Sequence, residues 1–176
     1  MMENKIKVLI DENKLNERLA ELANQISNDY TNEEIYLICV LKGAKYFAID
    51  ISKKLTNNII IMDFLKVSSY GVNNRESTGK IDFSLDISQD IKDKNVIIIE
   101  DIIDSGITLN YLYNYLKEKE PKSLKICVLL DKKERRQIDV KTDYVGFEIE
   151  NKFVLGYGLD YDEKYRNLPY IGYIEQ

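Results

Sequence analysis

The chain has 176 residues and a formal net charge of −5, from 25 Lys and Arg against 30 Asp and Glu. This length allows one domain with a substantial core, so we expect residues 1–176 to form a single domain. The acidic balance disfavours nonspecific binding to nucleic acid or to a membrane surface, because both need a basic face. Neither a leader-like start nor a membrane-length apolar run is present, which predicts a cytoplasmic protein.

Histidine is absent from the chain, and only two cysteines occur. A Ser-His-Asp triad, a Cys-His pair and a histidine-bound zinc site are therefore excluded. Any acid-base chemistry must come from carboxylates, lysine or tyrosine. Cys39 and Cys127 each lie within an apolar, strand-like run, which predicts reduced core residues.

The first third of the chain predicts two strand-helix units. A short strand at 7–10 precedes Asp11, which we expect to cap a helix. The apolar face of that helix comprises Leu15, Leu19, Leu22, Ala23 and Ile26. An unbroken apolar run at 35–40 then predicts a strand buried on both faces. Lys42 and Gly43 follow it, and they suit either a phosphate-binding turn or a plain turn with a solvated lysine.

A polar stretch separates the next two expected strands, at 59–67 and 81–85. Residues 68–80 between them show neither helical nor alternating apolar spacing. Connections of this length are usually lids over a site or flexible hairpin tips, and the residues alone leave both open.

The stretch at 96–108 organises the rest of the chain. Its apolar run at 96–99 predicts another buried strand, and Glu100, Asp101 and Asp104 follow at the carboxyl end. Ligands of open parallel sheets bind beyond this end of the strands. Carboxylates this close repel one another, which favours a bound cation such as Mg²⁺, a ligand with many hydroxyls, or both.

Residues 105–108, Ser-Gly-Ile-Thr, supply hydroxyls and backbone N–H groups at the start of the next expected helix. Such a turn is suited to bind a phosphate. The alternative is a solvated acidic turn in which Asp104 or Ser105 is an ordinary N-cap. The helix carries its apolar face over residues 109–116 and must end before Pro121.

The last third begins with a buried strand at 124–130, which is followed by Asp131 and Lys132. A lysine just beyond a core strand can point into a site, although a cluster of basic residues is more often a solvated face. The aromatic, glycine-punctuated tail from about residue 143 predicts a small separate lobe. Within it, Phe153 is either a core aromatic or a stacking platform for a planar ligand.

Segment 100–108, Glu-Asp-Ile-Ile-Asp-Ser-Gly-Ile-Thr, resembles the phosphoribosyl-pyrophosphate loop of the type I phosphoribosyltransferases, most closely the hypoxanthine-guanine phosphoribosyltransferases. The tail motifs Val-Gly-Phe-Glu-Ile, Phe-Val-Leu-Gly-Tyr-Gly-Leu-Asp-Tyr and Tyr-Arg-Asn-Leu-Pro-Tyr-Ile resemble the family's purine-binding hood. The resemblance implies an α/β fold with a central, mostly parallel sheet flanked by helices. It also implies a hood lobe at about 143–176 and a mobile lid at about 68–80.

The activity that this resemblance implies is Mg²⁺-dependent transfer of 5-phosphoribosyl from phosphoribosyl pyrophosphate to N9 of hypoxanthine or guanine. The implied phosphoribosyl-binding residues are Glu100, Asp101, Asp104, Ser105, Gly106, Ile107 and Thr108. The implied pyrophosphate-binding residues are Lys42, Gly43, Ser69, Tyr70 and Arg166. The implied purine-binding residues are Lys132, Phe153, Val154 and Asp160, and the implied metal ligands are Glu100, Asp101 and Asp160. Asp104 is also the implied proton acceptor, and relatives form homodimers or homotetramers.

Two other functions fit parts of this pattern. One is a phosphoribosyltransferase for another base, such as xanthine or a pyrimidine, but Lys132 and the aromatic tail favour a six-oxo purine. The other is a nucleotide-sensing regulator that binds RNA on the same fold, which the acidic balance disfavours. A generic nucleotide-binding module is least favoured. The sequence contains neither of the two common glycine-rich phosphate-binding motifs, Gly-x-x-x-x-Gly-Lys-Ser/Thr and Gly-x-Gly-x-x-Gly.

Overall fold

The fold was analysed in a computed structural model, which describes residues 6–67 and 83–175. The expected lid at 68–80 lies outside the described residues. A main sheet of six strands has the order β4-β3-β2-β5-β6-β7, in which only the β3–β4 pairing is antiparallel. Its strands are β2 (Glu34–Val40), β3 (Ile59–Val67), β4 (Phe83–Leu85), β5 (Asn95–Ile103), β6 (Ser123–Asp131) and β7 (Tyr144–Glu148).

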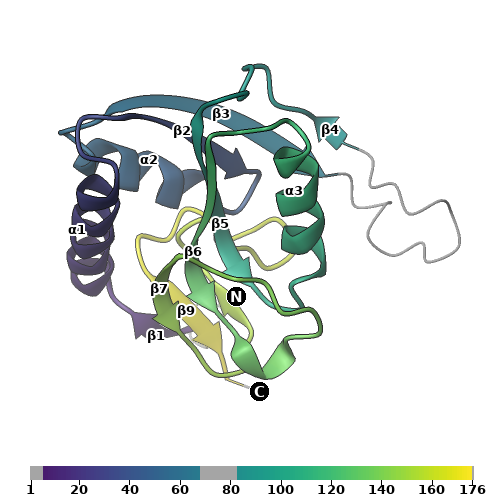
Figure 1. Cartoon of the computed structure of the whole chain (residues 1–176). Helices are drawn as coiled ribbons and strands as arrows, with labels where there is room; N and C mark the ends of the chain where they lie inside the picture. Colours follow the sequence, from purple (N-terminus) through teal and green to yellow (C-terminus); the bar gives the residue numbers. More distant parts are fainter. Residues whose placement is uncertain (1–5, 68–82, 176) are drawn as a thin grey trace, which may run out of the picture.

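Three helices cover the two faces of this sheet (Figure 1). One core contains the apolar sides of α1 (Glu12–Asp29) and α2 (Lys45–Lys54), and the other contains that of α3 (Ile107–Lys117). Asp11 caps α1 as expected, since its side chain accepts a hydrogen bond from Lys14 N at 2.9 Å. The predicted central sheet with flanking helices is confirmed.

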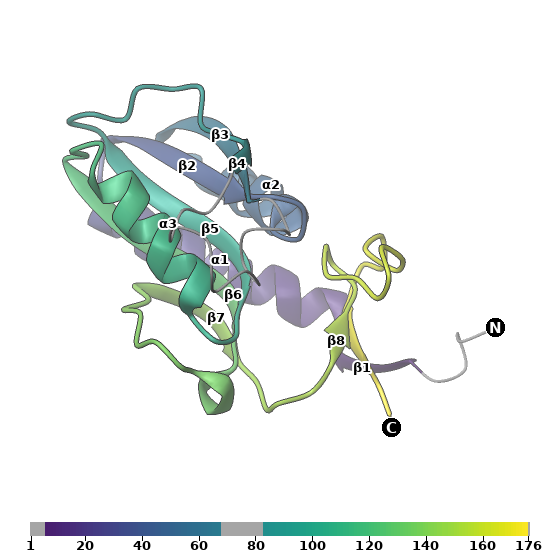
Figure 2. The ribbon, with the colours of Figure 1, turned by 90° about the vertical axis from the view of Figure 1, so that its right-hand side faces the viewer.

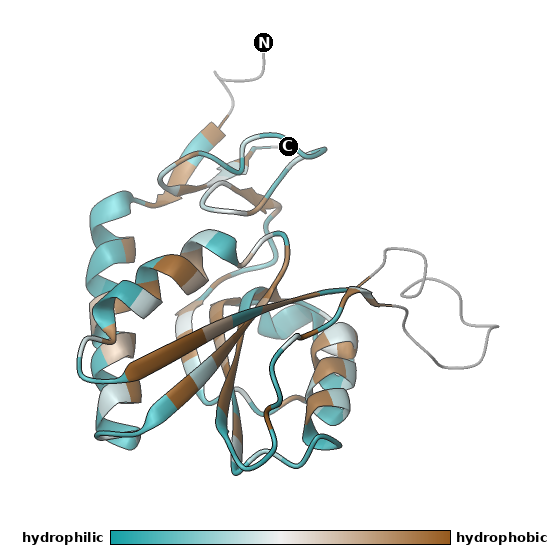
Figure 3. Cartoon of the chain, turned by 90° about the horizontal axis from the view of Figure 1, so that it is seen from above, coloured by the Kyte–Doolittle hydropathy of each residue, from teal (hydrophilic) through white to brown (hydrophobic). Residues whose placement is uncertain are grey.

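Alternation along the central strands explains why two cores form. In β5, Ile97 packs toward α1 and α2, whereas Ile98 packs toward α3. Figure 3 shows the apolar residues concentrated in these strands, while the outer surfaces of the helices are largely hydrophilic. Cys39 and Cys127 are both free and buried, as predicted, and burial raises the pKa of the Cys39 thiol to about 12.

A second sheet of three antiparallel strands forms a small lobe that stands apart from the main sheet (Figure 2). Its order is β1-β9-β8, from β1 (Ile6–Ile10), β9 (Ile171–Ile174) and β8 (Val154–Leu155). The expected lobe boundary at about 143 needs correction on two counts. β7 belongs to the main sheet, and the N-terminal strand β1 completes the lobe.

The position of β7 has a local reason. It pairs in parallel with β6, and a Cβ atom at Gly146 would lie only 2.4 Å from the carbonyl oxygen of Leu129. Glycine at position 146 therefore lets β7 lie close against β6, and no periodicity in a five-residue segment can indicate this pairing. Among the described residues, no helix is both long and apolar enough to cross a membrane.

Candidate active site

The candidate site lies at the carboxyl ends of β2, β5 and β6, where the small lobe meets the main sheet (Figure 2). Two glycines allow the closest approach. A Cβ atom at Gly43 would lie 1.5 Å from Asp101 Oδ2, and one at Gly158 would lie 2.0 Å from Gly43 O. The Asp101 carboxylate therefore fills the space that a side chain at position 43 would need, which requires glycine there. Nothing in the sequence indicates that the neighbouring Leu41–Lys42 peptide bond is cis.

Glu100 and Asp101 lie within β5, which continues to Ile103 rather than ending at residue 99 as expected. Burial, together with the charge of Asp101, holds the pKa of the Glu100 carboxyl well above its ordinary value. Burial also raises the pKa of Asp101, against a 2.7 Å hydrogen bond that its Oδ1 accepts from Ile102 N. The raised pKa values accord with the repulsion between neighbouring carboxylates that the sequence predicts.

The chain segment that follows β6 donates hydrogen bonds to the turn before α3. Gln137 N and Ile138 N donate to the carbonyl oxygen of Ser105 at 3.0 and 3.1 Å. Arg136 Nε donates to the carbonyl oxygen of Asp104 at 3.2 Å, and its guanidinium also pairs with Asp131. The Asp131 side chain is only 4% exposed and that of Arg136 15%, so this ion pair is buried.

Sequence reasoning missed Arg136 and Asp131 as supports of the turn. The only signal was the basic cluster after β6, and it indicated a solvated face. Lys132 is not part of a solvated face either, because it is only 6% exposed. Burial lowers the pKa of its ammonium, against the opposing effect of the nearby Asp104 carboxylate. By contrast, Lys133 pairs with Glu148 at the surface.

Gly106 occupies the N-cap position of α3 with a φ of +81°, a conformation that favours glycine. A Cβ atom there would lie 2.5 Å from the carbonyl oxygen of Ile138. Neither Asp104 nor Ser105 is therefore the N-cap residue, and glycine brings no side chain to cap the helix. Ser105 Oγ accepts only a 3.4 Å contact from Ile107 N. The start of α3 can thus bind an anion.

The carboxylate of Asp104 has two different oxygens. Oδ2 pairs with Arg135 Nη1 at 3.2 Å, whereas the buried Oδ1 has no hydrogen-bond partner within the described part of the chain. A buried acceptor without a donor is costly unless a ligand or water supplies one. The site therefore has an acceptor available beside Lys132.

On the opposite side, Lys42 and Arg166 converge on one carboxylate. Lys42 Nζ lies 2.8 Å from Glu163 Oε2, and Arg166 Nη2 lies 3.2 Å from Glu163 Oε1. Arg166 is also held by Gly158, because its Nη1 donates to that carbonyl oxygen at 2.7 Å. The fold thus brings together two of the expected pyrophosphate-binding residues, while Ser69 and Tyr70 lie outside the described residues.

The expected metal ligands are only partly gathered. Asp160 Oδ1 pairs with Arg166 Nη2 at 2.8 Å, and its Oδ2 accepts from Glu163 N at 2.8 Å. Within residues 6–67 and 83–175, no three acidic or cysteine side chains form a metal-ligand cluster. Glu100 and Asp101 alone still suit Mg²⁺, which typically takes one or two carboxylates and completes its shell with water and substrate phosphates.

The expected purine-binding residues of the lobe have contrasting surroundings. Phe153 is 50% exposed and packs edge-to-face on Tyr161 with ring centroids 5.5 Å apart, so it is not a core residue. Val154 is buried in β8. An exposed ring on a fixed strand end is available for stacking.

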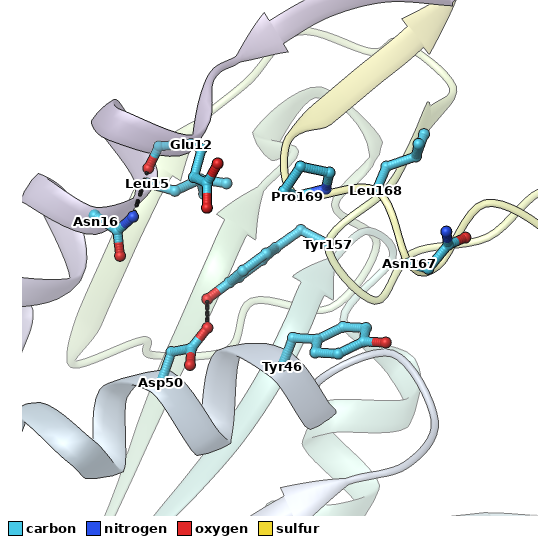
Figure 4. A pocket seen from close by; sticks show the side chains of 9 residues that line it. All are labelled: Glu12, Leu15, Asn16, Tyr46, Asp50, Tyr157, Asn167, Leu168 and Pro169. Atoms are coloured by element: carbon cyan, nitrogen blue, oxygen red, sulfur yellow. Dashed lines mark hydrogen bonds between the residues drawn. The ribbon is translucent and has the colours of Figure 1, made fainter. Parts of the chain in front are cut away.

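A separate pocket of about 220 Å³ lies between α1, α2 and the lobe (Figure 4). Tyr157 points across it and donates to Asp50 Oδ2 at 2.8 Å. None of the expected site residues lines this pocket. The bond from Tyr157 instead ties the lobe to α2.

Known proteins resemble this chain in sequence over most of its length. The model of the phosphoribosyl transferase domain matches residues 9–162. The hypoxanthine-guanine phosphoribosyltransferase of Bacillus subtilis (strain 168) is 44% identical over 176 residues, covering 99% of this chain and 97% of that protein. The bifunctional protein TilS/HprT of Listeria monocytogenes serotype 4b (strain F2365) is 45% identical over 96% of this chain. The chain spans only 26% of the length of that Listeria protein.

Solved structures agree with these relatives. A hypoxanthine-guanine phosphoribosyltransferase from Bacillus anthracis superposes with a TM-score of 0.89 at 47% identity, covering 98% of this chain and 99% of that chain. A hypoxanthine phosphoribosyltransferase from Staphylococcus aureus gives 0.92 at 40% identity, covering 99% and 94%. The expected type I phosphoribosyltransferase fold is confirmed.

Proposed function

We propose that this chain, which belongs to the phosphoribosyl transferase family, is a purine-salvage enzyme that makes nucleotides from hypoxanthine or guanine. It transfers the 5-phosphoribosyl group of phosphoribosyl pyrophosphate to N9 of the base and releases pyrophosphate. The high identity to relatives with that name, over nearly the whole chain, supports this reaction. One observation carries it furthest: the buried Lys132 lies beside Asp104, at the turn that opens α3.

The phosphoribosyl group binds at the turn in this proposal. The 5-phosphate lies at the N-terminus of α3, where residues 105–108 offer hydroxyl and backbone donors. Glu100 and Asp101 take the ribose hydroxyls, directly or through Mg²⁺. Mg²⁺ supplies charge neutralisation for the carboxylates and the diphosphate. As pyrophosphate leaves, the anomeric carbon gains positive charge, which the nearby carboxylates stabilise.

The purine is selected by a donor and an acceptor. Lys132 can only donate, so it suits the six-oxygen of hypoxanthine or guanine and not the amino group of adenine. Asp104 accepts the proton at N7, and its unpartnered Oδ1 supports that role. The ring of Phe153 stacks on the base, while backbone near Val154 and Asp160 contacts the two-position.

The leaving pyrophosphate is bound by the opposite side of the site. Lys42 and Arg166 neutralise its charge, and Gly43, Ser69 and Tyr70 contact it in this proposal. Asp160, whose carboxylate also pairs with Arg166, would hold a second Mg²⁺ that helps to neutralise the diphosphate. Reduced cysteines accord with the cytoplasmic location that we propose. We also propose a homodimer or homotetramer.

A direct assay tests the function. The protein is incubated with Mg²⁺ and phosphoribosyl pyrophosphate, and with hypoxanthine, guanine, xanthine or adenine in separate reactions. We expect nucleotide and pyrophosphate from hypoxanthine, guanine or both, and none from adenine. Nucleotide from adenine would contradict the role of Lys132, and no nucleotide from any base would overturn the function.

A further inference from the structure

The carboxylate of Glu163 occupies the position between the two cations to which the proposed function assigns the diphosphate. Its Oε2 lies 2.8 Å from Lys42 Nζ and its Oε1 lies 3.2 Å from Arg166 Nη2. A carboxylate and a diphosphate accept the same charge-assisted hydrogen bonds from ammonium and guanidinium groups. We propose that Glu163 is an internal competitor of pyrophosphate, which weakens its binding and speeds its release.

Arg166 is held in place independently of Glu163. Its side chain is only 16% exposed, Nη1 donates to the carbonyl oxygen of Gly158 at 2.7 Å, and Nη2 pairs with Asp160 at 2.8 Å. Removing the Glu163 carboxylate therefore leaves the guanidinium in position. Lys42 then meets an incoming phosphate without first breaking its ion pair with Glu163, and Arg166 keeps only its pair with Asp160.

The Glu163 side chain can leave the site at little cost. It is 65% exposed, and its partner Lys42 is 49% exposed, so both charges are largely solvated. The backbone of Glu163 is anchored separately, because its N–H donates to Asp160 Oδ2 at 2.8 Å. The side chain can thus swing away while the loop keeps its path.

These contacts determine how strongly Glu163 weakens pyrophosphate binding and which ligands it affects. Surface ion pairs are weak, so two of them correspond to about a two- to tenfold penalty on pyrophosphate binding. The penalty acts only on ligands that carry the diphosphate. Ribose 5-phosphate, which lacks it, binds at the α3 turn and does not compete with Glu163.

The neighbouring Asp162 provides a matched control. It pairs with Lys164 at 3.3 Å, and the structure shows no contact of its carboxylate with Lys42 or Arg166 among the described residues. Glu163→Gln and Asp162→Asn remove the same charge from adjacent positions. A difference between them therefore reports the local contact and not the net charge of the loop.

Inorganic pyrophosphate is titrated with Mg²⁺ into the wild-type protein and both variants by calorimetry, with ribose 5-phosphate as the second ligand. We expect Glu163→Gln to bind pyrophosphate about two- to tenfold tighter, with ribose 5-phosphate unchanged. Asp162→Asn should bind both ligands like wild type. Thermal unfolding verifies that all three proteins are equally folded.

The inference is overturned if the two variants bind pyrophosphate equally, or if Glu163→Gln strengthens both ligands alike. It is also overturned if no variant binds pyrophosphate. The inference rests on the proposed function, and the nucleotide assay separates their failures. Nucleotide formation with unchanged pyrophosphate affinity in Glu163→Gln rejects the competitor and keeps the reaction.

Discussion

The two sides of the site are fixed by different kinds of contact. On the side formed by residues 100–108 and 131–138, here the phosphoribosyl side, backbone hydrogen bonds and the buried Arg136–Asp131 pair hold the turn before α3. On the side formed by residues 41–43 and 158–166, the pyrophosphate side, Lys42 is held by its exposed pair with Glu163. The phosphoribosyl side is built before substrate arrives, whereas on the pyrophosphate side Arg166 is fixed by Gly158 and Lys42 must exchange its partner.

This difference matches what each side must do in the proposed reaction. Donors that are fixed in advance stabilise developing charge without reorganising at the moment of reaction. A leaving group must bind briefly and depart, so weak and exchangeable contacts suit it. Substitutions should therefore affect stability and turnover on the phosphoribosyl side more than on the pyrophosphate side.

The largest effect should come from Arg136→Ala. It leaves Asp131 as a buried charge without its partner, which typically destabilises a protein by about 3–5 kcal/mol. Urea unfolding measures the loss in the free energy of unfolding. Lys133→Ala, which removes an exposed cation three residues away, should change it little. Equal effects of the two variants would show that the buried pair does not hold the turn.

Asp104→Asn should lower kcat by at least about 10²-fold, because the amide can no longer accept a proton. The turn is held through the backbone of Asp104, so the fold and the KM values should change much less. Steady-state kinetics with each substrate varied separates the two quantities. A kcat near that of wild type would remove Asp104 from the role of proton acceptor.

Lys132→Ala should raise the KM for the purine base and leave the binding of phosphoribosyl pyrophosphate nearly unchanged. A hydrogen bond from a charged donor contributes about 1.5–3 kcal/mol, or roughly 10- to 150-fold in KM. Product formation with hypoxanthine and calorimetry with phosphoribosyl pyrophosphate measure the two effects. A loss confined to the sugar phosphate would contradict the assignment of Lys132 to the base.

Glu100→Gln should stabilise the ligand-free protein while lowering its activity. The wild-type carboxylate lies beside Asp101 in a partly buried position, and relieving such functional strain typically adds about 0.5–2 kcal/mol. Urea unfolding without Mg²⁺ tests this, with the exposed Glu134→Gln as the control. If Glu100→Gln is no more stable than wild type, other groups already offset the repulsion between Glu100 and Asp101.

The central sheet could be predicted because its signals are local. Unbroken apolar runs mark β2, β5 and β6, and Asp11 marks the start of α1 within a few residues. The small lobe was harder, since β1 and β9 pair across almost the whole chain. No short pattern reports a partner that far away.

Site residues could be nominated from the sequence, but their partners could not. Lys132 and Arg136 stand in one basic cluster, and only the fold shows that both are largely buried. Glu163 lies 121 residues from Lys42 and resembles any solvated glutamate in the sequence. The contacts that distinguish the two sides of the site are therefore properties of the tertiary structure.

The smallest expected effect concerns the exposed pair, and a double-mutant cycle measures it. Lys42→Met, Glu163→Gln and the double variant should give a small coupling in unfolding, because exposed pairs are well solvated. The coupling should weaken clearly in about 1 M salt, where the screening length is near 3 Å. A Lys42–Glu163 coupling that persists in salt would mean that the pyrophosphate side is also built in advance. A coupling energy as large as the loss of unfolding free energy in Arg136→Ala would mean the same.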